Sequence, residues 1–448
     1  MRVERDSLGE LCLPDDALYG IWSARAGDNF GLSQRPVSLR LIHATVKVKK
    51  AAALTYQKLG IGAPGVYRSI EEACDIVLSW EPEEARGAFI TDALQGGAGT
   101  STNMNVNEVL ANVALRVMGK RPGEYGFINP LDDVNRGQST NDVYPTALRI
   151  AAIELLRRLS LRCASLQTAL QRRENEFDDI PKLGRTELMD AVPVTLGGEF
   201  GAWAQAIARD RWRLYKAEER LRQVNIGGTA VGVPDRAARK YRFGVIEELR
   251  LITGIGLSAA EYPMDITQNN DVFVETSGLL KALAVNLMKI SNDLRLMNSG
   301  PRGGIGEIVL RELQAGSTIM PGKVNPVIPE AVMQAAMKVM AGDAAISEAA
   351  SRGEFELNAF LPLIADSLLE NLSLLERATA LFEEKCVNGL TADRERCLLL
   401  LESSCAFAAS YVPLLGYDRV SGIVRGGGSA MEIKDKLDRA AGEAKGIY

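Results

Sequence analysis

One segment of the chain gathers the residue types that acid–base chemistry and anion binding require. Gly316–Asn325 reads GSTIMPGKVN, and it holds the hydroxyl of Ser317, the ammonium of Lys323 and the amide of Asn325. Its glycines and its proline predict an irregular backbone path. Taken alone, the segment also fits a surface loop with an exposed lysine, so both interpretations stay open at this point.

Two other segments place several hydroxyl and amide side chains directly before helical sequence. Gly99–Asn105 reads GTSTNMN and precedes the helical run 108–118, while Gln138–Asp142 reads QSTND and precedes a long helix. Such residues are ordinary helix N-caps. A cap needs only one side chain, however, and surplus donors beside the free N–H groups of a helix start suit a carboxylate or another anion.

The sequence contains a single histidine, His43, which lies in the apolar helical run 39–53. Its apolar surroundings predict a structural role. One histidine excludes a His-rich zinc site and leaves little scope for a His-based catalytic triad. A general base in this protein is therefore expected to be another residue type.

The elements that position these segments are predicted to be long helices. Between Thr146 and Arg172, apolar residues recur on one helical face, with Pro145 in the first turn and Asp142 near the start. Long helices with few strand signals indicate a mainly α protein built on a helical bundle. Further helices are predicted at 196–224, 271–297, 329–350 and 357–381, and glycine-rich or polar interruptions at 95–107, 135–142, 184–195, 227–232 and 299–325.

Composition narrows the class of protein. The chain has 448 residues, of which 46% are hydrophobic, so it can form a large core. Its formal net charge is −5, whereas nucleic-acid-binding proteins usually carry a strongly basic surface. A charged N-terminus and the lack of a long apolar stretch predict no signal peptide, no membrane span and a cytoplasmic protein.

Six scattered cysteines predict buried free thiols. No dinucleotide, P-loop or Cys/His motif appears, so neither a cofactor nor a metal is predicted.

Together, the polar segments resemble the aspartase/fumarase superfamily over nearly the whole chain. The superfamily motif GSxxMxxKxN is matched within 316–325. Three more motifs follow its pattern, namely GTSTNMNxNE at 99–108, QSTND at 138–142 and GRTxLxDAVPxTLGxEF at 184–200. In detail, Ser101, Thr140 and the segment 384–392 are similar to aspartate ammonia-lyases rather than to class II fumarases.

The resemblance implies a homotetramer with a multi-helix core, in which each active site combines loops of three subunits. It also implies three domains: an N-terminal domain 1–141, a central helical-bundle domain 142–392 that carries the mobile loop 316–325, and a small C-terminal domain 393–448. The implied reaction is reversible elimination of ammonia from L-aspartate to give fumarate, through an aci-carboxylate intermediate. A modified aspartate or another amino-succinate is the alternative substrate, and fumarate hydration or a non-catalytic role are further alternatives.

The resemblance also implies roles for individual residues. Ser317 is implied to be the general base, ionised while its loop is closed. The carboxylate that becomes the aci-acid is implied to be held by Ser139, Thr140 and the backbone near Ser317 and Thr318. The other carboxylate is assigned to Thr186, Lys323 and Asn325, and the amino group to Thr100 and Asn141.

A few positions depart from the superfamily pattern. Glu187 stands where aspartases carry histidine or glutamine, and Asp133 stands where fumarases carry a second-site histidine. A carboxylate beside a dianionic substrate is unfavourable unless paired or protonated, whereas beside an ammonium it gains a charge-assisted hydrogen bond. Glu187 is therefore predicted to contact the amino group; the alternatives are pairing with a basic residue such as Arg185, or recognition of polar groups on a modified aspartate. Gly198, where glutamine is usual, enlarges nearby space.

Overall fold

The computed structural model describes residues 1–234 and 238–446 and confirms the mainly α prediction. The chain divides into two compact units. The first unit contains residues 1–160, 213–281 and 338–374, and the second contains 161–212, 282–337 and 375–448. The three-domain division expected from the sequence stays a prediction.

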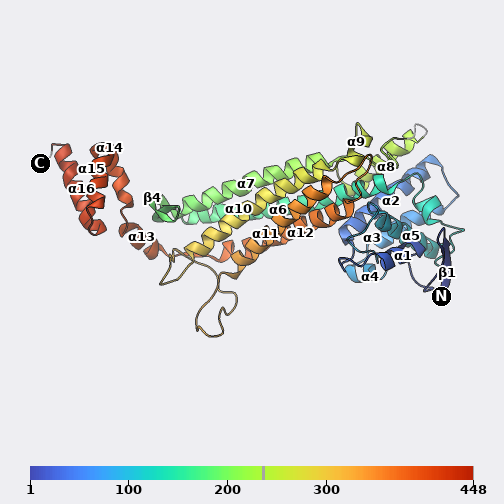
Figure 1. The fold of residues 1–448 in the computed structure, drawn as a ribbon, viewed down its shortest axis with the longest axis horizontal. Coiled ribbons are helices and arrows are strands. Elements are labelled where there is room, and N and C mark those ends of the chain that lie inside the picture. Colours follow the sequence, from blue (N-terminus) through green and yellow to red (C-terminus); the bar gives the residue numbers. More distant parts are fainter. Residues whose placement is uncertain (235–237, 447–448) are drawn as a thin grey trace. The chain divides into compact units, whose positions relative to one another are not determined.

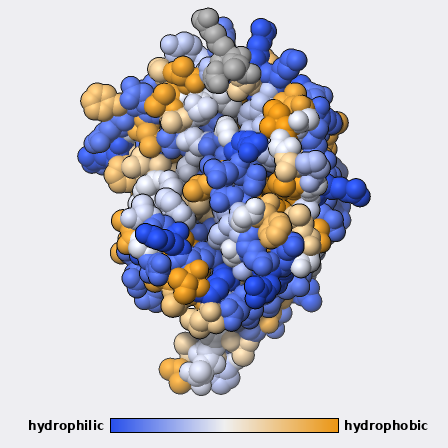
Figure 2. Space-filling model, turned by 90° about the vertical axis from the view of Figure 1, so that its right-hand side faces the viewer, coloured by the Kyte–Doolittle hydropathy of each residue, from blue (hydrophilic) through white to orange (hydrophobic). Residues whose placement is uncertain are grey.

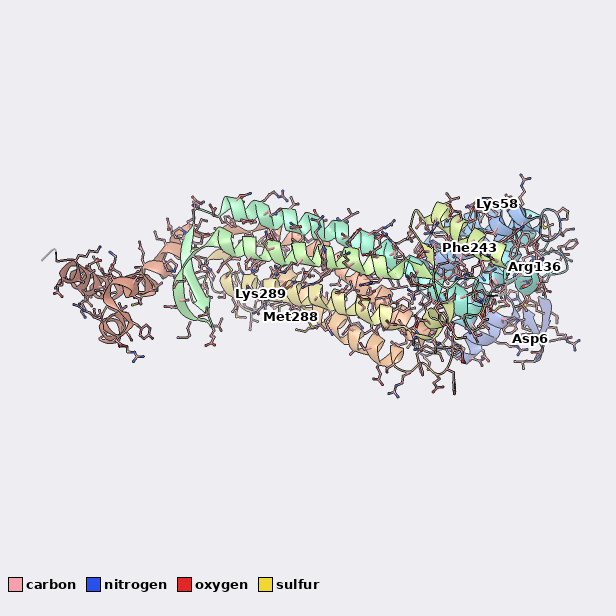
Figure 3. All side chains as sticks on the ribbon, turned by 90° about the horizontal axis from the view of Figure 1, so that it is seen from above. Asp6, Lys58, Arg136, Phe243, Met288 and Lys289 are labelled. Atoms are coloured by element: carbon pink, nitrogen blue, oxygen red, sulfur yellow. The ribbon has the colours of Figure 1, made fainter. Side chains whose placement is uncertain are left out.

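The first unit begins with a β-hairpin and a cluster of helices. β1 (Arg2–Asp6) pairs antiparallel with β2 (Gly9–Leu13). The cluster comprises α1 (Ile21–Asn29), α2 (Leu39–Leu59), α3 (Val66–Leu78), α4 (Pro82–Arg86), α5 (Thr100–Val117) and α8 (Arg239–Thr253). α2 packs against α3, α5 and α8 (Figure 1). Lys58 of α2 forms an ion pair with Glu248 of α8, and Figure 3 shows Lys58 in the same region as Phe243 of α8.

Five long helices extend through the boundaries between the units. They are α6 (Thr140–Glu176), α7 (Leu196–Leu221), α10 (Asp271–Met297), α11 (Val327–Ala350) and α12 (Leu361–Lys385). α10 has the predicted bounds, and the other helices overlap their predicted ranges. Smaller elements of the first unit are η1 (Pro130–Val134), β5 (Gln223–Val224), β6 (Ser258–Ala259) and α9 (Pro263–Gln268).

α6 begins at Thr140, with Asp142 in its first turn as predicted, but Pro145 lies inside the helix and not in its first turn. Proline lacks the N–H that would bond the carbonyl four residues before it, here that of Asn141. The side chain of Asn225 donates to that carbonyl at 2.9 Å. This replacement hydrogen bond explains how the helix starts ahead of its proline.

Two segments predicted to be irregular have regular structure. The polar segment after Gly99 forms the first turns of α5, and Gly99 itself is the N-cap with a φ of 94°. The interruption 184–195 is largely a hairpin of β3 (Pro181–Thr186) and β4 (Met189–Thr195) in the second unit. Figure 1 shows this hairpin at the end of α7.

The second unit also holds the small C-terminal elements. β7 (Ile308–Val309) pairs antiparallel with β8 (Thr391–Ala392), which follows η2 (Val387–Gly389). The helices α13 (Arg394–Glu402), η3 (Ala406–Tyr411), α14 (Val412–Leu415), α15 (Tyr417–Arg425) and α16 (Ala430–Ala444) come next. Ala408, Val420, Ile433 and Leu437 form an apolar core among the last of these.

All six cysteines are free, and four are buried as predicted, but Cys12 is exposed and Cys405 is half-buried.

The face in Figure 2 is mostly hydrophilic, with small separate hydrophobic groups. Among the described helices, none by itself has the length and apolarity of a membrane span; only the bent pair 394–402 and 406–415 meets those criteria together.

Candidate active site

The predicted site residues fall in both units. Four lie in the first unit, namely Thr100, Ser139, Thr140 and Asn141, and six lie in the second unit, namely Thr186, Glu187, Ser317, Thr318, Lys323 and Asn325.

The segment 316–325 is a loop whose two ends meet. The amide nitrogen of Asn325 donates to the carbonyl of Gly316 at 3.1 Å. A Cβ on Gly316 would lie 2.3 Å from the carbonyl oxygen of Lys323, so only glycine fits this closure. Gly322 has a φ of 78°, which also favours glycine. The glycines of the motif are thus required by the backbone path, as the sequence predicted.

The hydroxyl of Ser317 lies among backbone donors of its own loop. Its Oγ accepts hydrogen bonds from the N–H groups of Ile319 at 3.3 Å and Met320 at 3.0 Å. Such N–H groups commonly close a serine turn. They also stabilise negative charge on the oxygen, which is what a serine needs in order to act as a base. Thr318 and Lys323 are exposed on the same loop, so their side chains are free to meet a ligand.

In the first unit, Ser139 caps the start of α6. Its Oγ accepts from the N–H of Asn141 at 3.2 Å, and its own N–H donates to Asp142 at 3.0 Å. This pair resembles a capping box, with the Ser139 hydroxyl bonded one residue earlier than usual and an aspartate in place of the usual glutamate. The arrangement fixes Ser139, Thr140 and Asn141 at the helix N-terminus, where partial positive charge favours an anion.

Asp142 also ties the helix start to the segment 227–229. Its completely buried carboxylate accepts from the N–H groups of Gly227 and Thr229, each at 3.0 Å. Burial is the largest influence on its pKa, which rises from 3.8 to about 7 despite these hydrogen bonds and the charge of Lys49.

The titration of Asp142 predicts how stability changes with pH. The folded chain holds this proton more tightly than the unfolded chain, so the free energy of unfolding should fall as pH rises from the unfolded pKa of 3.8 to about 7. Asp142→Asn should remove that component, which is at most about 1.4 kcal/mol per pH unit. Urea unfolding of both proteins across this range measures it, and equal slopes would contradict the assignment.

Thr100 and Asn141 share a polarity that suits an ammonium group. The Thr100 hydroxyl donates to the carbonyl of Gly97 at 2.8 Å, and the Asn141 amide nitrogen donates to the carbonyl of Ala230 at 2.7 Å. Each side chain therefore keeps an oxygen that can accept. An ammonium is donor-only, so these two oxygens match the predicted contact with an amino group.

Thr100 also lines a cavity of about 220 Å³ in the first unit, together with Trp22, Arg25 and Met104. The Arg25 guanidinium is held by two hydrogen bonds to Asp6, at 2.8 and 3.0 Å. Sequence reasoning did not select Arg25. It lies on a different helix, and no motif-like spacing connects it to Thr100.

In the second unit, Thr186 and Glu187 lie at the tip of the β3–β4 hairpin. Thr186 pairs with Met189, so Glu187 and Leu188 form the two-residue turn, with φ values of 53° and 64°. A turn of this kind usually contains Asn or Gly, because other residues are strained there. This backbone strain therefore lies at Glu187, where the sequence predicts a substrate contact.

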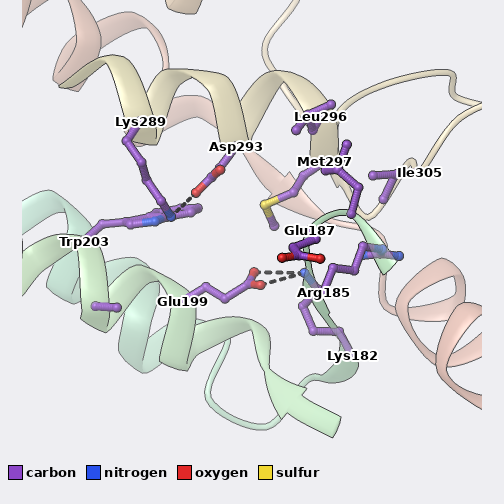
Figure 4. Close-up of a pocket in the computed structure, with 12 residues that line it drawn as sticks. Lys182, Arg185, Glu187, Glu199, Trp203, Lys289, Asp293, Leu296, Met297 and Ile305 are labelled. Atoms are coloured by element: carbon purple, nitrogen blue, oxygen red, sulfur yellow. Dashed lines mark hydrogen bonds and ion pairs between the residues drawn. The ribbon is translucent and has the colours of Figure 1, made fainter. Parts of the chain in front are cut away.

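Glu187 lines a cavity of about 420 Å³ whose other charged groups are paired (Figure 4). Lys182 bonds both oxygens of Glu199 at 2.9 Å, and Lys289 pairs with Asp293. Arg185 bonds Glu307 at 2.9 Å and forms no recorded ion pair with Glu187. Among the described residues, no ion pair involves Glu187.

The cavity wall contains a buried charge network that sequence reasoning missed. Glu307 is fully buried, and Lys182 approaches its second oxygen at 2.8 Å. The backbone of Glu307 bonds Met297 at the end of α10 and Asp393 before α13, both at 2.9 Å. Lys182 and Glu307 are far apart in sequence, so no local pattern could have indicated this pair.

The single histidine and the possible metal ligands were the other candidates for chemistry among the described residues. His43 lies on α2, half-buried, and burial lowers the pKa of its imidazole. Within residues 1–234 and 238–446, no group of three or more His, Cys, Asp or Glu side chains is arranged to hold a metal ion.

Comparison with known proteins gives consistent similarities. A family model described as lyase matches residues 9–341. The aspartate ammonia-lyase of Pseudomonas aeruginosa is 45% identical over 427 residues, which cover 95% of this chain and 90% of that protein. The crystal structure of fumarate lyase:delta crystallin from Brucella melitensis is 43% identical, with a TM-score of 0.89 and coverage of 97% and 99% of the two chains. A class II fumarase from Schistosoma mansoni is 31% identical, with a TM-score of 0.90 and coverage of 99% and 95%.

Proposed function

We infer that this chain, which belongs to the lyase family, is a carbon–nitrogen lyase. In the proposed reaction it reversibly eliminates ammonia from L-aspartate to give fumarate. Relatives named aspartate ammonia-lyase, at 40–45% identity over about 95% of the chain, support this reaction. The observation that carries the chemistry is the Ser317 oxygen with its two backbone N–H donors.

Ser317 acts as the general base in this proposal. Its ionised oxygen takes the proton from the carbon beside one carboxylate, and that carboxylate becomes a dianionic aci-acid. The carbon–nitrogen bond then breaks and ammonia leaves, giving fumarate. The N–H groups of Ile319 and Met320 stabilise the serine oxyanion, and closure of the loop excludes the water that would otherwise protonate it.

Substrate contacts follow from which groups can donate and which can accept. The aci-carboxylate is acceptor-only and is held by the hydroxyls of Ser139 and Thr140 and by the backbone at Thr318. The ammonium is donor-only and meets the free oxygens of Thr100 and Asn141. The second carboxylate is held by Thr186, Lys323 and Asn325, where the exposed lysine adds a charge-assisted hydrogen bond.

The active unit is proposed to be a cytoplasmic homotetramer in which three subunits contribute to each site. Large apolar side chains are exposed on the long helices, including Trp212 on α7 at 63% and Val285 on α10 at 50%. Packing of the long helices against those of other subunits would remove these side chains from water, which is favourable. Sedimentation analysis of the purified protein tests the assembly.

The reaction is tested by supplying L-aspartate, L-malate and argininosuccinate separately and following fumarate by its ultraviolet absorbance. We expect fumarate from aspartate and none from malate. Activity with malate and none with aspartate would overturn the proposed reaction.

A modified aspartate is the second candidate substrate, and Glu187 is the observation that favours it. The carboxylate of Glu187 has no ion pair among the described residues, and it lines a cavity of about 420 Å³. An amino-succinate with an additional cationic group would complement that charge. Preference for argininosuccinate in the same panel would favour this candidate over plain aspartate.

A further inference from the structure

A chain of buried hydrogen bonds in the first unit ends on Thr140. Asn103, which is on α5 and 2% exposed, donates from its amide nitrogen to the Thr140 Oγ1 at 3.2 Å. The same nitrogen donates to Asn135 Oδ1 at 3.1 Å. Asn107, one helical turn further along α5, donates to that same Asn135 oxygen at 3.1 Å but does not contact Thr140 among the recorded bonds.

The orientation of these amides can be deduced from a group that only accepts. The backbone carbonyl of Gln138 faces one end of the Asn135 amide at 3.1 Å, so that end must be the nitrogen. The oxygen of Asn135 therefore faces the opposite side. There it meets the Lys49 ammonium at 2.9 Å as well as the two asparagines of α5, which independently supports the same orientation.

Asn103 must then present its nitrogen to Asn135, and this fixes the polarity at Thr140. Both protons of the Asn103 amide are used, one on Asn135 Oδ1 and one on Thr140 Oγ1. The Thr140 oxygen consequently accepts, and its hydroxyl proton stays available. Among the described residues, no acceptor for that proton is recorded.

We propose that Asn103 is a positioning residue, which holds the Thr140 hydroxyl with its proton directed to the substrate carboxylate. This inference rests on the proposed function, because it takes Thr140 to contact the carboxylate that becomes the aci-acid. Without the Asn103 donor, the hydroxyl can turn its proton to a protein acceptor and present lone pairs to an anion. The repulsion that follows weakens substrate binding and, more strongly, the transition state.

The test changes the side chain of residue 103 from a hydrogen-bond donor to an acceptor of the same shape. Asn103→Asp replaces the donor by an acceptor, so the Thr140 proton turns to residue 103. We expect kcat/KM for aspartate to fall by about 10- to 100-fold, with most of the loss in kcat. Asn107→Asp is the matched control, because it adds the same charge to the same helix beside the same Asn135 oxygen. It should lower kcat/KM by only a few-fold.

A double variant separates positioning from general disturbance. In the Thr140→Val background, Asn103→Asp should lower kcat/KM no more than Asn107→Asp does. Equal effects of the two aspartates in the wild-type background, or full additivity with Thr140→Val, would overturn the proposal. If the aspartate variants fail to fold, Asn103→Ala compared with Asn107→Ala gives the same contrast without a buried charge.

The proposed function can fail separately from this inference. Wild-type kcat/KM in Thr140→Val would show that Thr140 does not hold the substrate, which would remove the basis of the proposal for Asn103. Loss of activity in Thr140→Val together with equal Asn103→Asp and Asn107→Asp variants would retain the substrate contact and reject only the positioning role.

Discussion

Replacing Ser317 by alanine is expected to lower turnover of aspartate by about 10³-fold or more while leaving the protein folded. The variant removes the oxygen that takes the proton, and no other described residue of the loop 316–325 offers a comparable base. Lys323 is the only other ionisable side chain within that loop, and it is assigned to a carboxylate. Initial rates of fumarate formation measure the effect.

The Ser317 oxygen contacts only backbone N–H groups of its own loop among the recorded bonds, so its loss should leave the melting temperature almost unchanged. Fumarate or succinate binding should also stay within a few-fold, since binding depends on other residues. Activity close to wild type would remove Ser317 from its role as base, whatever the thermal stability shows.

Replacing Glu307 by alanine is expected to lower the free energy of unfolding by about 3–5 kcal/mol. The carboxylate is fully buried and forms ion pairs with two cations, so its loss leaves Arg185 without its recorded ion-pair partner and Lys182 with Glu199 alone. Uncompensated charge in a buried site is strongly unfavourable. Denaturant unfolding followed by circular dichroism measures the change.

Glu312→Ala is the matched control, because Glu312 is an exposed carboxylate a few residues further along the same segment. A surface substitution of this kind changes stability by about 0.5 kcal/mol or less. Similar destabilisation by the two variants would show that the buried network contributes little to the fold.

The long helices were predictable because their apolar periodicity is local. α10 begins and ends where the sequence indicated, at Asp271 and Met297. The position of Pro145 inside α6 was not predictable, because the carbonyl that this proline leaves free is satisfied by Asn225, far along the chain. The β3–β4 hairpin was missed because its turn, Glu187–Leu188, lacks the glycine or asparagine that normally marks such a turn.

The candidate site was predictable in its loops and not in its supporting contacts. Motifs indicated Ser317 and Thr140, since hydroxyls at helix starts and glycine-bounded loops are visible in the order of residues. The partners that orient them come from other segments: Asn103 reaches Thr140 from α5, and Lys182 reaches Glu307 from β3. Only the folded chain brings such residues together.

The meeting of Gly316 with Asn325 has a consequence for how this protein can diverge from its relatives. The contact between the first glycine and the last asparagine ties the two ends of the loop together. A substitution in the interior of the loop is therefore expected to leave both ends where they are. We expect changes of substrate preference among related chains to arise more readily from the interior of this loop than from its two ends.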